Sequence, residues 1–367
     1  MISYGQHNLD NSDYQAVLQT LKSSHLTQGP KVPAFETALC KATGARYAVA
    51  VSSGTAALHL SYLAAGLKPK DEIITTPNTF VATTNMALTL GVKPVFADIN
   101  PNTYNLDENK IESLITPRTK AIVPVHFAGH PCHLNKIWQL AKKHNLTVIE
   151  DAAHALGSLY KNKPLGQGKS SMIILSFHPV KLITTGEGGA ILTNNKKLYN
   201  RLKLLRQQGV SKDSKGFNVM TELGYNYRLA DINAALGLSQ LTKLNKFTSA
   251  RRQIVNWYQT ELSNLSQIIL PTETPYSKSS WHLYVIRTQK PSHRLPLYNY
   301  LKKQGIGVNF HYPPVYSHPY YKNHGYKNVS LPTANNYAST AITLPIHPTL
   351  TKTQVKFICH HLKKFFS

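Results

Sequence analysis

Two ionisable side chains, Asp151 and Lys181, stand close to the ends of apolar, strand-like runs. A carboxylate at the end of a buried strand is costly unless it has a partner or a chemical task. Asp151 could simply cap a helix, and a lone lysine beside apolar strands is usually solvated. The alternative is that the two share a site, in which the carboxylate faces a cationic heterocycle and the amine acts as a nucleophile.

A third feature of the sequence could bind phosphate. Ser53-Gly54-Thr55 stands where the strand-like run at residues 48–51 turns into a helical pattern, and backbone amides at a helix N-terminus bind anions. Alone, this segment is equally typical of an ordinary helix cap. Together with Asp151, Lys181 and the glycine-rich segment 186–189 that follows the lysine, it completes the groups that a pyridoxal phosphate enzyme requires.

The elements that must position these residues alternate between strands and helices. From residue 46 the apolar patterns predict an α/β fold, in which a mostly parallel sheet is covered by helices on both faces. The predicted strands are residues 48–51, 72–75, 94–97, 121–125 and 147–151, and the predicted helices are residues 53–65, 79–90, 108–115 and 134–144. Ligands of such sheets bind at the carboxyl ends of the strands.

The pattern changes near residue 245. A long helix is predicted at residues 245–262, and strands at 281–287 and 306–310 precede an amphipathic helix at 351–365. We therefore expect two domains. The large cofactor-binding domain is residues 1–245, with an N-terminal active-site segment, and the smaller α+β domain is residues 246–367.

The composition argues against a membrane or disulfide-rich protein. Hydrophobic residues make up 42% of the chain, no apolar run is long enough to span a membrane, and the N-terminus does not resemble a secretion signal. The three cysteines lie far apart, which is typical of reduced thiols. We therefore expect a cytoplasmic protein without membrane contact.

The charge is strongly positive, with 41 Lys and Arg against 17 Asp and Glu and a net charge of +24. Because the basic residues are scattered, we interpret them as a solvated surface that favours anionic ligands and expect no nucleic-acid interface. We also expect no metal site, because His130, Cys132 and His133 are crowded and lack a fourth ligand at a normal spacing.

Six motifs, spread in order over nearly the whole chain, together resemble the sugar-nucleotide aminotransferases of the DegT type. These enzymes have fold type I of the pyridoxal phosphate enzymes. The motifs are Leu26-Thr27-Gln28-Gly29 with Phe35-Glu36, residues 52–58, residues 150–157, residues 176–181, residues 186–189 and residues 224–229. The resemblance implies a homodimer with shared active sites and pyridoxal 5'-phosphate as the cofactor.

The resemblance also implies a role for each matching residue. Lys181 forms the Schiff base and moves the proton, and Asp151 pairs with the pyridine nitrogen. The other implied cofactor contacts are Gly54, Thr55 and Ser176 at the phosphate, Phe80 stacked on the ring, His154 near the ring, and Asn226 at the phosphate bound by a neighbouring subunit. The implied substrate contacts are Tyr4, Ser24, His25, Leu26, Thr27, His311, Tyr312, Pro313 and Pro314.

The implied reaction is the transfer of an amino group, with L-glutamate as the expected donor, to C4 of a UDP-linked 4-keto-6-deoxy-N-acetylhexosamine. The segments 75–77, 80–83 and 311–316 favour this substrate, which would lead to UDP-4-amino-4,6-dideoxy-N-acetyl-β-L-altrosamine in pseudaminic acid biosynthesis. Transfer to a 4-keto- or 3-keto-sugar carried by GDP or dTDP stays open. So does a dehydratase of the same fold, although dehydratases of the family have His in place of Lys181. The third alternative is a non-enzymatic, nucleic-acid-binding regulator.

Overall fold

The computed structural model describes residues 1–367, and its largest element is a seven-stranded sheet in the order β1-β9-β8-β5-β4-β2-β3. The strands are β1 (Tyr47–Val51), β2 (Glu72–Thr75), β3 (Lys93–Phe96), β4 (Thr119–Val123), β5 (Thr147–Asp151), β8 (Met172–Ser176) and β9 (Gly189–Thr193). From β8 to β3 all pairs are parallel, whereas β9 runs antiparallel to both of its neighbours.

Two apolar cores cover the two faces of this sheet. Neighbouring residues of a strand point to opposite faces, and in β1 Ala48 and Ala50 join one core while Val49 and Val51 join the other. The first core includes residues of α2 (Lys31–Thr43), α5 (Leu134–Lys143) and α7 (Asp231–Leu241), and the second includes residues of α3 (Gly54–Ala64), α4 (Ala82–Leu88) and α6 (Lys196–Arg206). The expected α/β class, with a mostly parallel sheet between helices, is confirmed.

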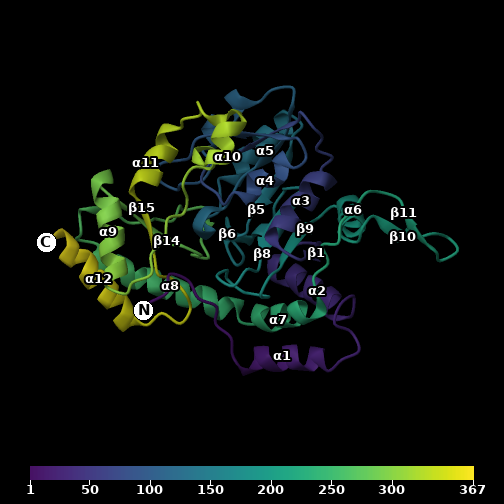
Figure 1. The fold of residues 1–367 in the computed structure, drawn as a ribbon, viewed down its shortest axis with the longest axis horizontal. Coiled ribbons are helices and arrows are strands. Elements are labelled where there is room, and N and C mark those ends of the chain that lie inside the picture. Colours follow the sequence, from purple (N-terminus) through teal and green to yellow (C-terminus); the bar gives the residue numbers. More distant parts are fainter.

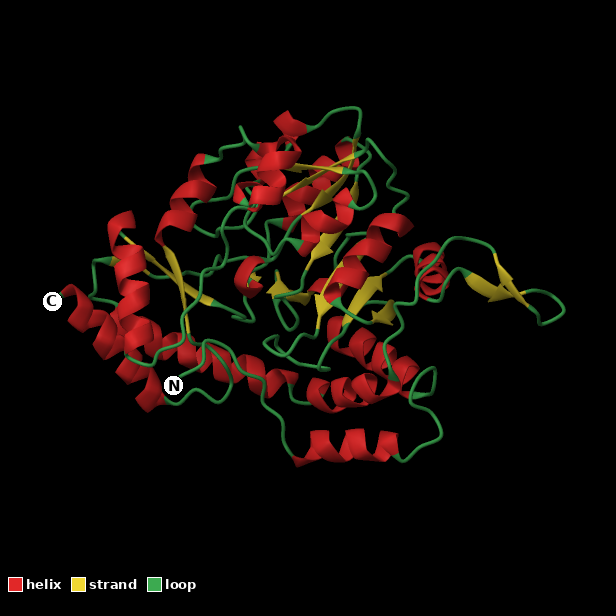
Figure 2. Cartoon of the chain, in the orientation of Figure 1, coloured by secondary structure: helices red, strands yellow, loops and turns green.

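A separate three-stranded antiparallel sheet lies in the C-terminal part of the chain (Figure 2). Its strands are β12 (Ile268–Ile269), β14 (Tyr284–Thr288) and β15 (Ala341–Leu344). The helices α8 (Leu244–Leu262), α9 (Pro291–Lys303) and α12 (Lys352–Phe366) contribute to its own core of 20 buried residues, and α11 (Pro332–Thr340) packs beside them. The division into two domains near residue 245 stays a prediction.

Two elements lie at the periphery of the molecule (Figure 1). Helix α1 (Asn11–Leu21) packs along α7, and a hairpin of β10 (Val210–Lys212) and β11 (Asn218–Met220) projects away from the body. The remaining regular elements are β6 (Leu159–Tyr160), β7 (Lys163–Pro164), β13 (Ser277–Lys278) and the single turn α10 (Pro319–Tyr321). None of the helices combines the length and the apolar character needed to cross a membrane.

Four predicted elements differ from those observed. The helix predicted at 79–90 is only α4, because Asn78 binds the carbonyl of Tyr104 and the amide of Tyr312 and so keeps the preceding turn non-helical. The helix predicted at 108–115 is a pair of short 3₁₀ turns, with Thr116-Pro117 directly after it.

The other two differences are in the C-terminal part. The strand predicted at 281–287 begins only at Tyr284, because Trp281 has a φ of 52°, in the left-handed region, which no strand residue adopts. The strand predicted at 306–310 is reduced to single bridges, from Ile306 to Ile2 and from Asn309 to Thr343.

Candidate active site

A cavity of about 640 Å³ opens at the carboxyl ends of the large sheet, where the doubly wound topology predicts a ligand. It lies between the large sheet and the C-terminal part of the chain. The predicted site residues that line it are Tyr4, Gly54, Thr55, Phe80, Asp151, His154, Ser176, Lys181, His311, Tyr312 and Pro313. We call Gly54, Thr55, Asp151, Ser176 and Lys181 the sheet side of the cavity, and His282, His311, Tyr312 and Pro313 its C-terminal side.

One end of the sheet side has free amides at a helix N-terminus. Ser53 caps α3, since its side chain and its carbonyl accept the amides of Ala56 and Ala57, which leaves those of Gly54 and Thr55 without an intrahelical partner. A Cβ on Gly54 would lie only 3.0 Å from the Cβ of Ser176. The close approach brings the Ser176 hydroxyl beside the two amides, an arrangement that suits an anion.

Asp151 stands at the end of β5, and each of its carboxylate oxygens accepts one hydrogen bond. The Thr83 hydroxyl donates to Oδ2 at 2.7 Å and the amide of Ala153 donates to Oδ1 at 3.1 Å. Thr79 is 2.8 Å from Thr83 and extends this chain of hydroxyls. The buried carboxylate is therefore held in one orientation, with lone pairs left for a cationic donor in the cavity.

Lys181 lies in the turn between β8 and β9, where its amide binds the carbonyl of His178. Burial lowers the pKa of its ammonium group to about 8, although the Asp151 carboxylate opposes this shift. A partly buried amine with a pKa near neutrality is a competent nucleophile and proton carrier.

The C-terminal side brings two predicted residues, His311 and Tyr312, into the same cavity as Asp151 and Lys181. Tyr312 approaches His154, with its hydroxyl 3.3 Å from Nε2, and its amide donates to Asn78. His311 lies 2.8 Å through Nδ1 from the Thr343 hydroxyl. Burial, followed by the charge of Lys181, lowers the pKa of His311 to about 4, and the same two causes lower the pKa of His154.

Six predicted site residues do not line the cavity of their own chain: Ser24, His25, Leu26, Thr27, Asn226 and Pro314. The segment 24–27 is held near α7, because Thr27 bridges Ala230 and the Leu26 carbonyl accepts the amide of Asp231. Asn226 pairs with Gln207 outside the cavity. The roles of these six residues stay predictions.

Sequence reasoning missed two residues of this site. Thr83 stands out in the sequence only as part of the segment 80–83, and its contact with Asp151 spans 68 positions, so no local signal predicts it. His282, which lines the cavity, stands inside the apolar run Trp281-His282-Leu283-Tyr284. A histidine within such a run is a weak signal, since histidines are often buried in cores.

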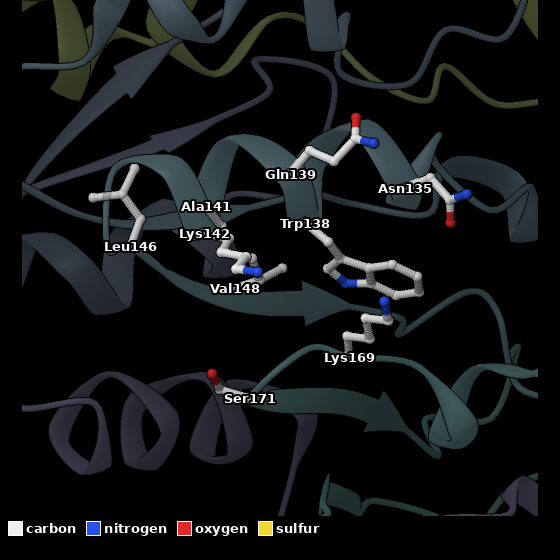
Figure 3. A pocket seen from close by; sticks show the side chains of 9 residues that line it. All are labelled: Asn135, Trp138, Gln139, Ala141, Lys142, Leu146, Val148, Lys169 and Ser171. Atoms are coloured by element: carbon white, nitrogen blue, oxygen red, sulfur yellow. The ribbon is translucent and has the colours of Figure 1, made fainter.

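A second hollow, of about 530 Å³, lies at the opposite, amino-terminal ends of β5 and β8 (Figure 3). No carboxylate lines it, and the indole of Trp138 already donates a hydrogen bond to Ser170. Its lining residues are Asn135, Trp138, Gln139, Ala141, Lys142, Leu146, Val148, Lys169 and Ser171. The cavity at the carboxyl ends is therefore the candidate active site.

Comparisons with known proteins agree with this geometry. The profile of the DegT/DnrJ/EryC1/StrS aminotransferase family matches residues 7–363. A UDP-4-amino-4,6-dideoxy-N-acetyl-beta-L-altrosamine transaminase of Campylobacter jejuni is 41% identical over 363 residues, which cover 98% of this chain and 96% of that protein.

Solved structures extend the similarity to the whole fold. Helicobacter pylori PseC, an aminotransferase of pseudaminic acid biosynthesis, superposes with a TM-score of 0.95 at 37% identity and covers 100% of this chain and 99% of its own. A putative sugar aminotransferase of Streptococcus pneumoniae, Spr1654, solved in PMP and PLP forms, gives a TM-score of 0.95 in its PMP form at 30% identity, with 99% and 98% of the two chains covered. The chain therefore belongs to the DegT/DnrJ/EryC1/StrS aminotransferase family, and it is a transaminase whose cofactor is pyridoxal phosphate.

Proposed function

We propose that this transaminase moves the amino group of L-glutamate to C4 of a UDP-linked 4-keto-6-deoxy-N-acetylhexosamine. The product is UDP-4-amino-4,6-dideoxy-N-acetyl-β-L-altrosamine, for pseudaminic acid biosynthesis. The observation that carries this proposal is the 41% identity, over nearly the full length of both chains, to the Campylobacter jejuni transaminase named for that product. The likeness to Helicobacter pylori PseC supports the same substrate.

The residues of the sheet side fit pyridoxal phosphate. The free amides of Gly54 and Thr55, beside the Ser176 hydroxyl, suit the phosphate group, and Asp151 suits the pyridine nitrogen. When bound, the cofactor supplies an aldehyde that condenses with amines and a ring that accepts electrons. Phe80, exposed at the cavity wall, would cover the face of that ring.

The side chains of the cavity have separate roles in the proposed reaction. Lys181, with its lowered pKa, is the amine that would hold the cofactor. Once displaced, it would take up the proton that leaves the α-carbon of the amino donor and deliver it to the cofactor. Asp151, fixed by Thr83 and Ala153, keeps the ring nitrogen protonated. Tyr4, His311 and Tyr312 line the opposite wall and offer polar tips to the hydroxyl groups of the sugar.

The charge of the cavity supports a shared site in a homodimer. A sugar nucleotide carries a diphosphate, yet Lys181 is the single lysine or arginine among the lining residues. Asn226 and the segment 24–27, which lie outside the cavity of their own chain, are proposed to serve the partner's cavity. The projecting hairpin (Figure 1) carries exposed apolar side chains, with Phe217 66% and Met220 60% exposed, as expected for a surface that a second copy covers.

The experiment that tests the proposal is incubation of the holoenzyme with glutamate and a panel of UDP-, GDP- and dTDP-linked 4-keto- and 3-keto-sugars, read by mass change. Amination of the UDP-linked 4-keto-6-deoxy-N-acetylhexosamine should be fastest. Faster amination of a GDP- or dTDP-linked sugar would contradict the proposed substrate and leave the transaminase assignment intact. A donor panel of amino acids, with the UDP-sugar held constant, tests glutamate in the same way.

Two earlier alternatives lose their support. A dehydratase would lack the lysine that stands at position 181, and a non-enzymatic regulator would not need a transaminase site. We also propose that the reaction takes place in the cytoplasm, which is consistent with Cys40, Cys132 and Cys359 all being free thiols.

A further inference from the structure

The backbone that enters the C-terminal side of the cavity is strained at one residue. Trp281 has a φ of 52°, although it carries a bulky side chain that is 6% exposed. A non-glycine residue in the left-handed region costs free energy and persists only where its surroundings hold it. The residue that follows the strained position, His282, lines the active-site cavity.

Hydrogen bonds on both sides of Trp281 hold this conformation. Ser280 is fixed in position, because its amide donates to the Ser158 hydroxyl at 3.0 Å and its own hydroxyl donates to the carbonyl of His154 at 3.1 Å. Arg251, 1% exposed and without a carboxylate partner, donates through Nη1 to the carbonyls of Trp281 and His282 at 3.2 and 3.1 Å. The buried guanidinium group of Arg251 therefore holds the backbone of His282.

The imidazole of His282 packs against that of His154. The two ring centroids are 4.4 Å apart and the rings are tilted by 48°. His282 is 4% exposed, and Nδ1 of each ring is buried without a hydrogen-bond partner. Buried polar atoms are normally paired, so a histidine kept here at a cost to stability suggests a task in the site.

Burial and the charges around His282 favour the uncharged form of both imidazole rings. Burial lowers the pKa of His282 well below its usual value, and His154, Lys181, Arg251 and His311 all act in the same direction. Burial and Lys181 do the same for His154. Two uncharged imidazoles can lie in contact, whereas two charged ones would repel.

We propose that His282 is a positioning residue of the transaminase, because its ring fixes the orientation in which His154 faces the cofactor. The inference rests on the proposed placement of the cofactor ring beside His154. It explains why a strained backbone, a buried arginine and two unpaired ring nitrogens occur together at the wall of this cavity. The contact is one between aromatic rings, so its loss is a moderate effect.

A double-mutant cycle on the holoenzyme tests this proposal. His282→Leu removes the ring with little change in volume, and His154→Gln removes its partner. In the half-reaction with the amino donor alone, followed by the cofactor's visible absorbance, His282→Leu should slow the reaction about five- to tenfold. In the His154→Gln background the same substitution should change the rate less than about twofold, because a positioning residue acts through its partner.

Two further measurements separate this role from a structural one. His347 is equally buried and faces the same Arg251 charge, but it does not line the cavity, so His347→Leu is the matched control and should leave the rate of the half-reaction unchanged. The melting temperature of His282→Leu should stay at or above that of the wild type, and the Kd of the apoprotein for pyridoxal phosphate should rise.

Three outcomes would overturn the inference. Equal slowing by His282→Leu and His347→Leu would mean that the loss is structural. Multiplicative effects of the two substitutions would mean that His282 acts independently of His154. An unimpaired His154→Gln enzyme would show that the cofactor is not placed beside His154. Because no sugar is used, a wrong sugar substrate does not alter these results.

Discussion

The two sides of the active-site cavity are held in place by different means. On the sheet side, Asp151 and Ser176 end strands β5 and β8, and Gly54 begins the helix that follows β1, so backbone ladders fix all three. On the C-terminal side, His311 and His282 belong to irregular connections that side chains hold, through Thr343 and Tyr337 for His311 and through Arg251 for His282.

This difference predicts a division of labour. Chemistry on the cofactor needs fixed geometry, which the hydrogen-bonded strands of the large sheet supply. Selection among sugars needs surfaces that can vary, which connections supply. Substitutions on the sheet side should therefore abolish turnover, and those in the segment 311–313 of the C-terminal side should weaken one substrate. His282, which is proposed to act through His154, is the exception on that side. The predictions below test this division, starting with the largest effect.

Lys181→Ala should lower turnover by about 10⁴-fold, because the substitution removes both the nucleophile and the proton carrier. Reduction of the wild-type holoenzyme with borohydride, followed by peptide mapping, should place the cofactor on Lys181. A label on another lysine would contradict the assignment. Lys169, an exposed lysine at the second hollow, supplies the matched control, and Lys169→Ala should keep full activity.

Asp151→Asn should lower kcat by about 10²–10³-fold while the cofactor stays bound. An amide keeps the shape of the side chain but cannot stabilise a protonated ring nitrogen as a carboxylate does. Absorbance spectra show whether the cofactor is retained. Thr83→Val, which removes only the donor to Oδ2, should have a smaller effect. Near-normal turnover of Asp151→Asn would mean that Asp151 only stabilises the turn after β5, through its bond to the amide of Ala153.

The contrast between the two sides also explains what the sequence could predict. The strands that carry Asp151 and Ser176, and the helix start at Gly54, follow from local apolar patterns and helix signals, so the predicted residues meet in one cavity. Strand ends are informative because the topology of the sheet brings them together.

The C-terminal side lacks such local rules. The run Trp281 to Arg287 predicts a strand from residue 281. However, Arg251 donates to the carbonyl of Trp281 and the amide of Ser280 donates to Ser158, and these bonds hold Trp281 in the left-handed region. The approach of His282 to His154 links positions 128 residues apart, and that of Thr83 to Asp151 spans 68. Such contacts depend on packing of distant segments, which no periodicity in the sequence reports.

A shared site would add a third group of residues, those supplied by the partner. Lys181→Ala and Asn226→Ala should each be nearly inactive alone. Mixed under conditions that exchange subunits, they should recover about one quarter of the wild-type activity, because half of the dimers are hybrids and one of their two sites is intact. Activity assays with subunit exchange verified by mass spectrometry check this. Absence of rescue after proven exchange would place Asn226 outside the partner's site.

The lowered pKa of Lys181 makes the sheet side sensitive to pH. Only the uncharged amine attacks the cofactor aldehyde, and burial sets the pKa of the ammonium group at about 8. The rate at which the apoprotein takes up pyridoxal phosphate should therefore be flat above pH 8 and fall about tenfold per pH unit below it. Stopped-flow absorbance measures this rate. A midpoint near the ordinary lysine value of about 10.4 would show that the amine is solvated.

His311→Ala is the smallest expected effect and tests the C-terminal side. Nδ1 of His311 is occupied by Thr343, so Nε2 is the atom left for a ligand in the cavity, and loss of one such hydrogen bond should raise the KM for the sugar nucleotide about tenfold. The half-reaction with the amino donor should hardly change, because His311 belongs to the C-terminal side and not to the proposed phosphate-binding group of Gly54, Thr55 and Ser176. Thr343→Val, which frees the ring without removing it, should raise this KM less. If His311→Ala slows both half-reactions equally, then the segment 311–313 supports the chemistry as well, and the division of labour between the two sides is wrong.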